Sequence, residues 1–390
     1  MKIAVIHSLF RPYKRGGAEV VVDIVVNELT KLGHQVVLIT LGRENRVQQE
    51  GDLKIYRIDP FNVFSFLDIN NRPIWLRVFW HPLDVFNVSS YRRVKNILKQ
   101  EQPEVVLTHN LKGIGYLVPR AIKKAGIRHI HTVHDVQLSR PSGLIIYGQE
   151  KPFLLIDKVY EKTVRRLMGS PDVVISPSRW LMGYYQARGF FYESKKIILP
   201  NPIIFKKVDK QPDDEAASQI IKLIFVGQLE RFKGILFLIE ALKKISSPNW
   251  QLLIVGSGGA ETEVKQAVDG DQHFQLIGRV EQNKLADYYR QADLTVVPSL
   301  CYENSPKVID ESLVANVPVI ASDIGGVSEI VKDDYNGFTF APGNQENLIE
   351  VLEYFLNHPE KIAELKKNCF VSVRNFSVGN YLKKIISLIQ

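Results

Sequence analysis

The chain has 390 residues, of which 45% are hydrophobic and 24% charged, a composition typical of a globular protein that is too long for one core. No apolar stretch approaches the roughly 18 residues of a membrane-spanning helix, and the only two cysteines, Cys301 and Cys369, exclude a disulfide framework and favour a reducing compartment. The net charge of +8 is unevenly spread, with 30 Lys and Arg against 17 Asp and Glu in residues 1–200 and 20 against 25 in residues 201–390.

The basic excess of the N-terminal half favours an anionic partner. A membrane surface and a phospholipid-linked acceptor both fit this charge. Nucleic acid fits least well, because the chain has no zinc-ligand spacing, RNP-like aromatic motif or other nucleic-acid module. We therefore expect a cytoplasmic protein, peripheral on the inner face of the membrane, with no nucleic-acid partner.

The first half of the chain alternates short apolar runs with amphipathic helices. Residues 2–7 form the first run, a loop with Gly16-Gly17 follows, and a helix over 18–32 ends at Gly33, a residue that suits a helix C-cap. Further strands are expected at 36–40, 104–109, 129–134 and 173–176. The alternation predicts a parallel sheet covered on both faces, as an N-terminal Rossmann-like, acceptor-side domain over residues 1–200.

Residues 61–91 interrupt this alternation with aromatic residues and interleaved arginines. One interpretation is an aromatic-rich subdomain packed on the sheet of its own domain, because aromatic side chains dominate protein cores. The other is a surface that binds an acceptor or contacts a membrane, since aromatic residues with arginines suit a lipid interface. The residues concerned are Phe61, Phe64, Phe66, Trp75, Phe79, Trp80, Phe86 and Tyr91, with Arg72, Arg77, Arg92 and Arg93.

A second series of strands and helices follows Pro200-Asn201-Pro202 and a polar connector over residues 206–218. It predicts a C-terminal donor domain over residues 203–375, with residues 376–390 as a helix that crosses back to the N-terminal domain. The fold class is therefore α/β, with two doubly wound Rossmann-like domains facing each other across a cleft, where ligands bind beyond the carboxyl ends of the strands. Its strands are expected at 222–227, 251–255, 274–277, 294–297 and 318–321.

Two glutamates eight positions apart, Glu303 and Glu311, follow the apolar strand over 294–297. Pro306 is placed for the first turn of the next helix. The N-terminus of that helix would bind a phosphate through its N–H groups and its positive dipole end. A carboxylate on each side of a phosphate site suits a nucleotide-sugar, whose sugar and ribose carry hydroxyl groups.

A second candidate phosphate site is the loop from Gly227 to Gly234. Lys233 can neutralise a diphosphate there as a point charge, and the two glycines let the backbone approach closely. The run Gly256-Ser-Gly258-Gly259 lacks the third glycine of a dinucleotide fingerprint, which favours a plain tight turn. The segment Asp269-Gly-Asp271 likewise favours a polar turn over a metal site, and we expect no metal and no cofactor.

In the N-terminal half, His109 and the run His131-Thr-Val-His134 each follow a predicted strand. His134 stands at the strand end, where its side chain could reach a sugar hydroxyl. His131, inside the apolar run, is expected to be structural.

Taken together, these motifs resemble the retaining glycosyltransferases of family 4, which have the GT-B fold and include glycogen synthase and phosphatidylinositol mannosyltransferase-like enzymes. The resemblance covers nearly the whole chain and is strongest over residues 222–343, where the motifs follow the family's order. They are Gly227–Gly234, Gly278-Arg-Val280, Ala292-Asp-Leu, Pro298-Ser, Glu303 with Glu311, Pro318–Ser322, Gly325-Gly326, Glu329 and Gly337, with Gly16-Gly17-Ala-Glu19 and Pro200-Asn201 upstream.

The resemblance implies a role for each matching residue. Glu303 would lie under the donor sugar and His134 beside it as the catalytic pair. Glu311 would bind the ribose hydroxyls and Lys233 the diphosphate. The residues implied to contact the donor are Gly16, Gly17, Gln228, Arg231, Lys233, Arg279, Val280, Ser305, Lys307, Val308 and Glu311.

Two positions depart from the family pattern. Gln228 stands where many members have an arginine, which removes one positive charge from the diphosphate site, and Arg231 is a candidate to compensate. Asn304-Ser305-Pro306 stands where many members have Gly-Phe-Gly, and Pro306 has no N–H to donate to a phosphate.

We therefore expect a retaining, metal-independent hexosyltransferase that moves glucose or a related sugar from a nucleotide diphosphate sugar, with a UDP-sugar favoured. The expected acceptor is a glycan or a polyprenyl-linked saccharide of cell-surface polysaccharide synthesis. No second carboxylate is placed for a covalent intermediate, so a front-face substitution is favoured. The alternatives are a nucleotide-sugar epimerase or hydrolase on the same fold, or a non-catalytic nucleotide-sugar-binding protein.

Overall fold

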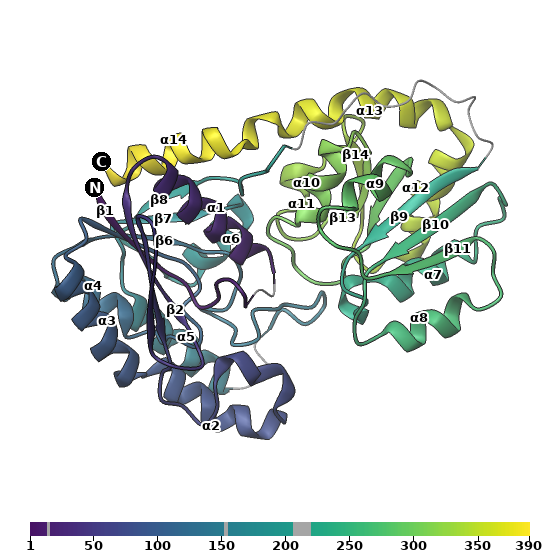
Figure 1. Cartoon of the computed structure of the whole chain (residues 1–390). Helices are drawn as coiled ribbons and strands as arrows, with labels where there is room; N and C mark the ends of the chain where they lie inside the picture. The colour runs from purple at the N-terminus through teal and green to yellow at the C-terminus, as the bar shows by residue number, and fades with distance from the viewer. Residues whose placement is uncertain (14–15, 152–154, 206–219) are drawn as a thin grey trace. The chain divides into compact units, whose positions relative to one another are not determined.

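The structure, a computed structural model, describes residues 1–13, 16–151, 155–205 and 220–390 (Figure 1). The chain divides into two compact units. Unit 1 comprises Met1–Leu144, Lys151–Pro202 and Val378–Gln390, and unit 2 comprises Ile145–Glu150 and Ile203–Ser377. Ile145–Glu150 thus belongs to unit 2 although it lies within the range expected for the N-terminal domain. The connector expected over residues 206–218 lies outside the described residues.

Unit 1 is built on an eight-stranded sheet of order β3-β4-β2-β1-β5-β6-β7-β8 (Figure 1). All neighbouring strands are parallel except β3 and β4. The strands are β1 (Lys2–Ile6), β2 (Gln35–Leu41), β3 (Arg46–Glu50), β4 (Leu53–Ile58), β5 (Val105–Thr108), β6 (Arg128–Thr132), β7 (Val173–Ser176) and β8 (Lys195–Ile198).

Helices cover this sheet because its central strands are apolar along their whole length. One face of β1 (Ile3 and Val5) packs with α1 and α14 in a single core. The helices of unit 1 are α1 (Gly17–Lys31), η1 (Phe66–Asn71), α2 (Ile74–Val85), α3 (Val88–Glu101), α4 (Val118–Lys124), α5 (Leu155–Met168), α6 (Arg179–Ala187) and α14 (Val378–Ile389).

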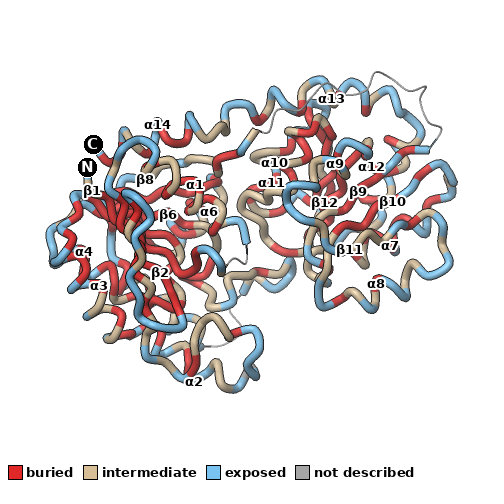
Figure 2. Tube along the Cα trace, in the orientation of Figure 1, coloured by how far each residue is buried: buried red, intermediate tan, exposed pale blue. Residues whose placement is uncertain are grey.

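Unit 2 is a six-stranded parallel sheet of order β11-β10-β9-β12-β13-β14. Its strands are β9 (Ile221–Val226), β10 (Trp250–Val255), β11 (Phe274–Gly278), β12 (Leu294–Val297), β13 (Val319–Ser322) and β14 (Gly337–Phe340). Its helices are η2 (Arg231–Lys233), α7 (Ile235–Leu242), α8 (Glu261–Val268), α9 (Leu285–Arg290), α10 (Lys307–Val314), α11 (Val327–Ile330), α12 (Gln345–Asn357), α13 (Pro359–Val373) and η3 (Arg374–Phe376). Figure 2 shows the sheets of both units as the buried part of each.

The aromatic segment contains no strand and only part of it is buried. Trp80 is fully buried against Phe64 and Phe66, with ring centroids 6.0 and 5.8 Å apart, and its indole N–H donates to the Phe64 carbonyl at 2.9 Å. Phe61 and Phe79 are instead exposed. The core interpretation therefore holds for the Trp80 cluster alone. Within the described ranges, no helix is both long and apolar enough to span a bilayer.

Candidate active site

The order of strands in unit 2 reverses between β9 and β12. From β9 the chain proceeds outward through β10 and β11, and β12 then pairs on the other side of β9 and continues to β13 and β14. Ligands of doubly wound sheets bind beyond the carboxyl ends of the strands at such a reversal. The loop that follows β9 carries Lys233, and the loop that follows β12 carries Glu303, so the topology brings together two sequence segments seventy residues apart.

Gly234 holds these two loops in close contact. Its φ of +76° lies in the left-handed region, and a Cβ at this position would stand 1.8 Å from the Pro298 carbonyl oxygen. Only glycine is compatible with both conditions. The glycine therefore places Lys233 directly beside the end of β12.

Lys233 and Glu303 form an ion pair in which Nζ lies 2.5 Å from Oε1, and the two side chains are 25% and 16% exposed. Burial acts to lower the pKa of Lys233, but the adjacent Glu303 carboxylate outweighs it, and the net result is a raised pKa. The lysine is therefore a permanent cation held at the strand ends. A ligand diphosphate that binds it has to compete with Glu303.

The backbone and side chain of Glu303 are each fixed by a second segment. The Ser299 hydroxyl donates to Oε1 at 3.0 Å. The Glu303 carbonyl accepts from the Gly326 N–H at 2.7 Å, and a Cβ on Gly325 would stand 2.1 Å from that carbonyl oxygen. These contacts orient the carboxylate before any ligand binds, as electrostatic catalysis requires.

Helix α10 begins at Lys307, with Pro306 at its N-cap position, so the proline precedes the first turn that it was expected to join. The first N–H groups of a helix have no partner within the helix, and the expected donor contacts Lys307 and Val308 are the first two residues of α10. Pro306 supplies no N–H, but its carbonyl accepts from the Ile309 N–H at 3.0 Å. The start of α10 can therefore serve as a phosphate cradle only through residues after the proline.

Glu311 lies one turn further along α10. Its Oε1 accepts from Gln282 Nε2 at 2.5 Å, and its Oε2 from the Tyr289 hydroxyl at 3.4 Å. Burial raises the pKa of Glu311, while its hydrogen bonds and the charge of Lys307 oppose the shift. A half-buried carboxylate with two neutral donors can exchange them for ligand hydroxyls, which suits the ribose-binding role expected for it.

The neighbouring Asp310 allows the effect of burial on a carboxyl group of α10 to be tested. It is 5% exposed, and its Oδ1 has no hydrogen-bond partner within the part of the chain that the structure describes. Burial, followed by the charge of Glu311, raises its pKa to about 8. The folded state therefore keeps a proton that the unfolded chain releases near pH 4, so this group lowers the free energy of unfolding as the pH rises from about 4 to about 8. In Asp310→Asn that part of the pH dependence should vanish, a difference of roughly 2–5 kcal/mol across the range.

Urea unfolding of wild type and Asp310→Asn between pH 5 and 8 measures this difference. Asp287→Asn, at an exposed position of α9, is the matched control and should retain the wild-type slope. Parallel slopes for wild type and Asp310→Asn would show that Asp310 is ionised without cost in the folded state.

The other expected donor contacts of unit 2 follow the ends of β9, β11 and β12. Gln228 and Arg279 are exposed, Val280 is half-buried against Tyr289, and Ser305 is half-buried just before α10. Arg231 pairs with Glu263 of α8, with Nη2 2.5 Å from Oε2. The structure therefore brings Lys233 and Glu303 into contact. Arg231 is paired with Glu263 instead and does not join them.

In unit 1 the order of strands reverses between β1 and β5, and each of three neighbouring strands there is followed within two residues by a histidine. His7 follows β1, His109 follows β5 and His134 comes shortly after β6. The Nδ1 of His109 lies 2.9 Å from the Nε2 of His134, with the rings stacked 5.2 Å apart. Burial is the first cause that lowers the pKa of His134 to about 4 and of His7 to about 3, so both imidazoles are neutral near pH 7.

His131, expected to be structural, is buried and its Nδ1 lies 2.8 Å from the Thr108 hydroxyl. His7 is the residue that the sequence reasoning missed. It is fully buried and neither ring nitrogen has a hydrogen-bond partner among the described residues. Its position at the end of the first apolar run was the available signal, because strand ends at a reversal point line the ligand site.

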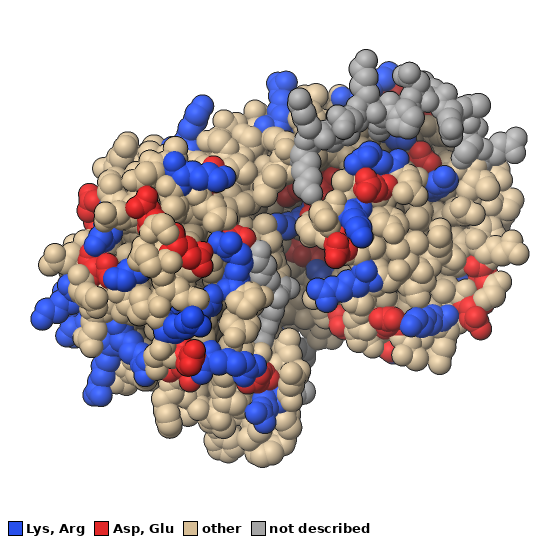
Figure 3. Space-filling model, viewed as in Figure 1, with Lys and Arg blue, Asp and Glu red and all other residues tan. Residues whose placement is uncertain are grey.

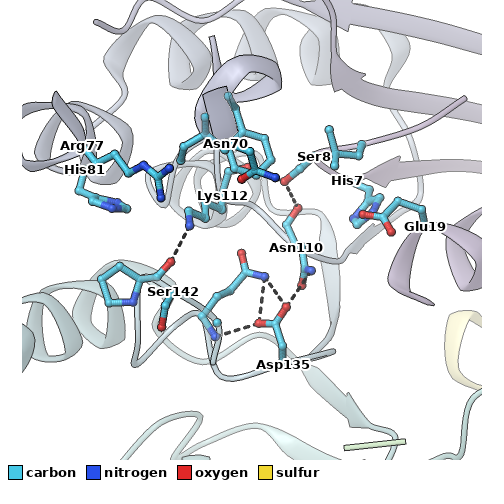
Figure 4. Close-up of a pocket in the computed structure, with 16 residues that line it drawn as sticks. His7, Ser8, Glu19, Asn70, Arg77, His81, Asn110, Lys112, Asp135 and Ser142 are labelled. Atoms are coloured by element: carbon cyan, nitrogen blue, oxygen red, sulfur yellow. Dashed lines mark hydrogen bonds between the residues drawn. The ribbon is translucent and has the colours of Figure 1, made fainter. Parts of the chain in front are cut away.

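A pocket of about 500 Å³ opens beside these strand ends (Figure 4). In Figure 4, Arg77, His81 and Lys112 occupy one end of it and Glu19 the other, with Asp135 between them. Burial, followed by the charges of Lys112 and Arg77, lowers the pKa of His81 to about 4, which identifies that end as electropositive. The lining residues are His7, Ser8, Leu9, Glu19, Phe66, Ile69, Asn70, Arg77, His81, Asn110, Lys112, Asp135, Gln137, Pro141, Ser142 and Gly143.

The glycine loop meets this pocket through Glu19. Helix α1 begins at Gly17 with Gly16 at its N-cap, and the Gly16 N–H donates to Glu19 Oε2 at 2.7 Å. Glu19 is 7% exposed and lines the pocket. His134 does not line the pocket, but the next residue, Asp135, does.

No group of three or more His, Cys, Asp or Glu in the described ranges is arranged to hold a metal ion. Asp269 and Asp271 lie in the turn after α8. There the Asp271 carboxylate accepts from the His273 N–H at 3.0 Å and lies 2.9 Å from His273 Nδ1. The turn predicted for this segment is confirmed.

Two family models match the chain. One, described as Glycosyltransferase Family 4, matches residues 15–205, and the other, Glycosyl transferases group 1, matches residues 208–370. A candidate teichuronic acid biosynthesis glycosyltransferase of Bacillus subtilis, TuaC, is 27% identical over 407 residues, covering 99% of this chain and 97% of that protein. A lipopolysaccharide 1,2-N-acetylglucosaminetransferase of Salmonella typhimurium is 28% identical over 220 residues, covering 51% of this chain and 57% of that protein.

Solved structures share the fold. Sucrose-phosphate synthase from Thermosynechococcus elongatus superposes with a TM-score of 0.78 at 19% identity, over 99% of this chain and 98% of that one. Anabaena HepE, solved in complex with UDP and glucose, has a TM-score of 0.72 at 17% identity, over 100% and 99%. The two parallel-sheet units are those of the GT-B fold, and the chain belongs to the family 4 glycosyltransferases.

Proposed function

We propose that this glycosyltransferase moves a hexose, glucose or a closely related sugar, from a UDP-sugar to a glycan or polyprenyl-linked acceptor of cell-surface polysaccharide synthesis, with retention of anomeric configuration. The observation that carries the proposal is the buried Lys233–Glu303 pair between the loop after β9 and the start of α10. It combines a cation for a diphosphate with a carboxylate for sugar hydroxyls. Two relatives are named for polysaccharide or lipopolysaccharide synthesis, which supports the acceptor class.

In the proposed reaction the acceptor hydroxyl attacks the anomeric carbon from the face that the diphosphate leaves. The bond between that carbon and the diphosphate oxygen breaks, and its electron pair stays on the diphosphate. Lys233 and the N–H groups of Lys307 and Val308 stabilise the growing negative charge. The acceptor proton passes to the leaving diphosphate oxygen, so the step needs no protein nucleophile, and we propose that it needs no metal.

The remaining expected roles complete this proposal. Glu311 exchanges Gln282 and Tyr289 for the ribose hydroxyls, and His134, neutral in the folded state, accepts or donates a hydrogen bond at the donor sugar. The pocket of unit 1 takes the acceptor. Its electropositive end at Arg77 and Lys112 suits an acceptor with an anionic group, in keeping with the basic charge of the N-terminal half.

A thermal-shift panel of UDP-, GDP- and ADP-sugars tests the donor. UDP-glucose should raise the Tm most, and Glu311→Gln should lose most of that shift, because a bound ligand stabilises the folded state in proportion to its affinity. A larger shift with GDP-mannose would overturn the choice of base.

Product analysis with and without a glycan acceptor tests the reaction class. The proposal expects sugar transfer that depends on the acceptor and an α-linked product from an α-linked donor. Donor consumption without acceptor would favour an epimerase or hydrolase. Donor binding without turnover across an acceptor panel would favour a non-catalytic binding protein.

A further inference from the structure

Helix α2 is apolar on two sides: Trp80 and Val85 are buried beneath it, while other large apolar side chains face solvent. Arg77 and His81 line the pocket of unit 1. Asp84 is 2% exposed, and its Oδ1 accepts from the Gly113 N–H at 2.8 Å. The large apolar side chains that face solvent are Trp75, Val78, Phe79, Leu83 and, just after the helix, Phe86, here called the α2 face; Trp75 and Phe79 are 64% and 62% exposed.

The α2 face is a single continuous stripe. Its members recur at intervals of three and four residues, which places them on one side of a helix. Phe61 and Val63 are also exposed, and the Phe61 carbonyl accepts from the Asn87 side chain at 3.0 Å, next to the end of α2. A contiguous apolar stripe of this kind on a folded surface marks an interaction site.

The stripe is held in place from beneath. Trp80, on the opposite side of α2, is fully buried, and its backbone carbonyl accepts from the Asn62 side chain at 3.3 Å. The Trp80 cluster and the buried Asp84 therefore fix the rotation of the helix. The exposed side chains are displayed by a packed helix and are not the result of fraying.

The charge around the α2 face identifies its partner. Residues 72–100 contain six Lys and Arg and one acidic residue, Asp84, which is buried. Arg77 lines the pocket, and the other five are Arg72, Arg92, Arg93, Lys95 and Lys99. Figure 3 shows a mostly uncharged surface over α2 and a concentration of Lys and Arg over α3 and α4 beside it.

We propose that the α2 face inserts into the interfacial region of an anionic lipid bilayer. A helix with aromatic and aliphatic residues on one side and basic residues at its margin binds at the boundary of headgroups and acyl chains. The basic residues add attraction to anionic headgroups. A second copy of this chain is the less suitable occupant, because the same basic margin would meet itself.

This docking goes beyond glycosyl transfer and has one consequence that rests on the proposed function. The inner side of α2 carries Arg77 and His81 into the pocket proposed for the acceptor. An acceptor anchored in the bilayer by its lipid would therefore be presented at that pocket by the same helix that binds the membrane.

Vesicle co-sedimentation of the full chain tests the proposal, with phosphatidylcholine vesicles that contain or lack phosphatidylglycerol. Wild type should bind the anionic vesicles, and the triple variant Trp75→Ser, Phe79→Ser, Phe86→Ser should bind at least ~10-fold more weakly, because each buried apolar side chain contributes substantially. The control triple variant Leu32→Ser, Val47→Ser, Tyr192→Ser removes three exposed apolar side chains elsewhere in unit 1 and should bind like wild type.

Trp75 supplies an independent readout. It is largely exposed, whereas Trp80 and Trp250 are buried, so its emission should shift to shorter wavelength on anionic vesicles. Trp75→Phe should keep the binding and lose most of the spectral shift. Equal vesicle binding by the wild type and the α2 triple variant would overturn the proposal, as would a wild-type dimer in solution that the triple variant dissociates.

Binding of UDP, measured by calorimetry, separates this proposal from the proposed function. The triple variant should bind UDP like wild type, because none of its three positions lies in unit 2. Wild type that binds UDP but not anionic vesicles would overturn the docking and leave the transferase proposal intact. Wild type that binds anionic vesicles but not UDP would overturn the transferase proposal and leave the docking intact.

Discussion

Glu303→Gln should reduce sugar transfer by roughly 10²–10³-fold, the usual effect of removing one preorganised electrostatic group. Glutamine keeps the shape and the hydrogen bond from Ser299 but removes the charge that would stabilise the oxocarbenium-like sugar. The affinity for UDP should stay the same or rise slightly, because the diphosphate would no longer compete with Glu303 for Lys233, whose Nζ now lies 2.5 Å from the carboxylate.

Steady-state kinetics for transfer and calorimetry for UDP binding measure the two effects separately. Glu346→Gln, at an exposed position in the first turn of α12, is the matched control and should change neither. Turnover near the wild-type rate in Glu303→Gln would remove Glu303 from the chemistry. A loss of UDP binding equal to the loss of rate would assign it to binding instead.

Lys233→Met should weaken UDP binding by roughly 10–100-fold, because a hydrogen bond to a charged group contributes about 1.5–3 kcal/mol. Methionine retains the apolar stem that passes between the loops and removes only the ammonium group. The binding should also become less sensitive to salt, since one ion pair with the diphosphate is lost. Calorimetry at low and high salt measures both effects, with Lys244→Met, an exposed lysine that follows α7, as control.

A double-mutant cycle separates the effect of Lys233→Met on folding stability from its effect on UDP binding. Lys233→Met alone leaves the Glu303 carboxylate without its cation, which is costly for a largely buried charge. Adding Glu303→Gln should therefore recover part of the lost folding stability without recovering UDP binding. Unchanged UDP affinity in Lys233→Met would place the diphosphate elsewhere, with Arg231 as the next candidate if it exchanges Glu263 for the ligand.

The central strands of both sheets could be predicted because an apolar run is a strong local signal. The strand expected at 294–297 coincides with β12, and the helix expected at 376–390 corresponds to α14, which spans Val378–Ile389. Two edge strands, β3 and β14, were missed for a physical reason. β3 reads Arg-Val-Gln-Gln-Glu and is largely exposed, and β14 reads Gly-Phe-Thr-Phe with only its two ends buried, so neither shows a continuous apolar run.

The candidate site could be predicted as a set of residues but not as an arrangement. Glu303, Glu311 and Lys233 were identified from local sequence, yet nothing local says that Lys233 pairs with Glu303. That contact depends on β9 lying beside β12, which is a property of strand order. The same applies to Gln282 and Tyr289, which contact Glu311 from another helix and its preceding loop, and to His7, which meets His109 only across neighbouring strands.

Ile145–Glu150 belongs to unit 2 although it lies between two segments of unit 1 in the sequence, and this order of segments has a consequence for folding during synthesis. Those residues lie beside Leu300–Tyr302. The Tyr147 N–H donates to the Leu300 carbonyl at 2.9 Å, and the Tyr302 N–H donates to the Ile145 carbonyl at 2.9 Å. The chain therefore passes from one unit to the other after residues 144, 150, 202 and 377. Neither unit is a continuous piece of sequence.

During synthesis, the core of unit 1 is still incomplete after all the strands of its sheet have emerged from the ribosome. Tyr381, Ile385 and Leu388 of α14 belong to that core, and they are translated only after all of unit 2. Until then the α14 side of the sheet lacks its cover, and a chain stopped near residue 377 would carry an unfinished hydrophobic surface. The order of the segments in the chain therefore prevents unit 1 from completing its fold before unit 2 has been synthesised.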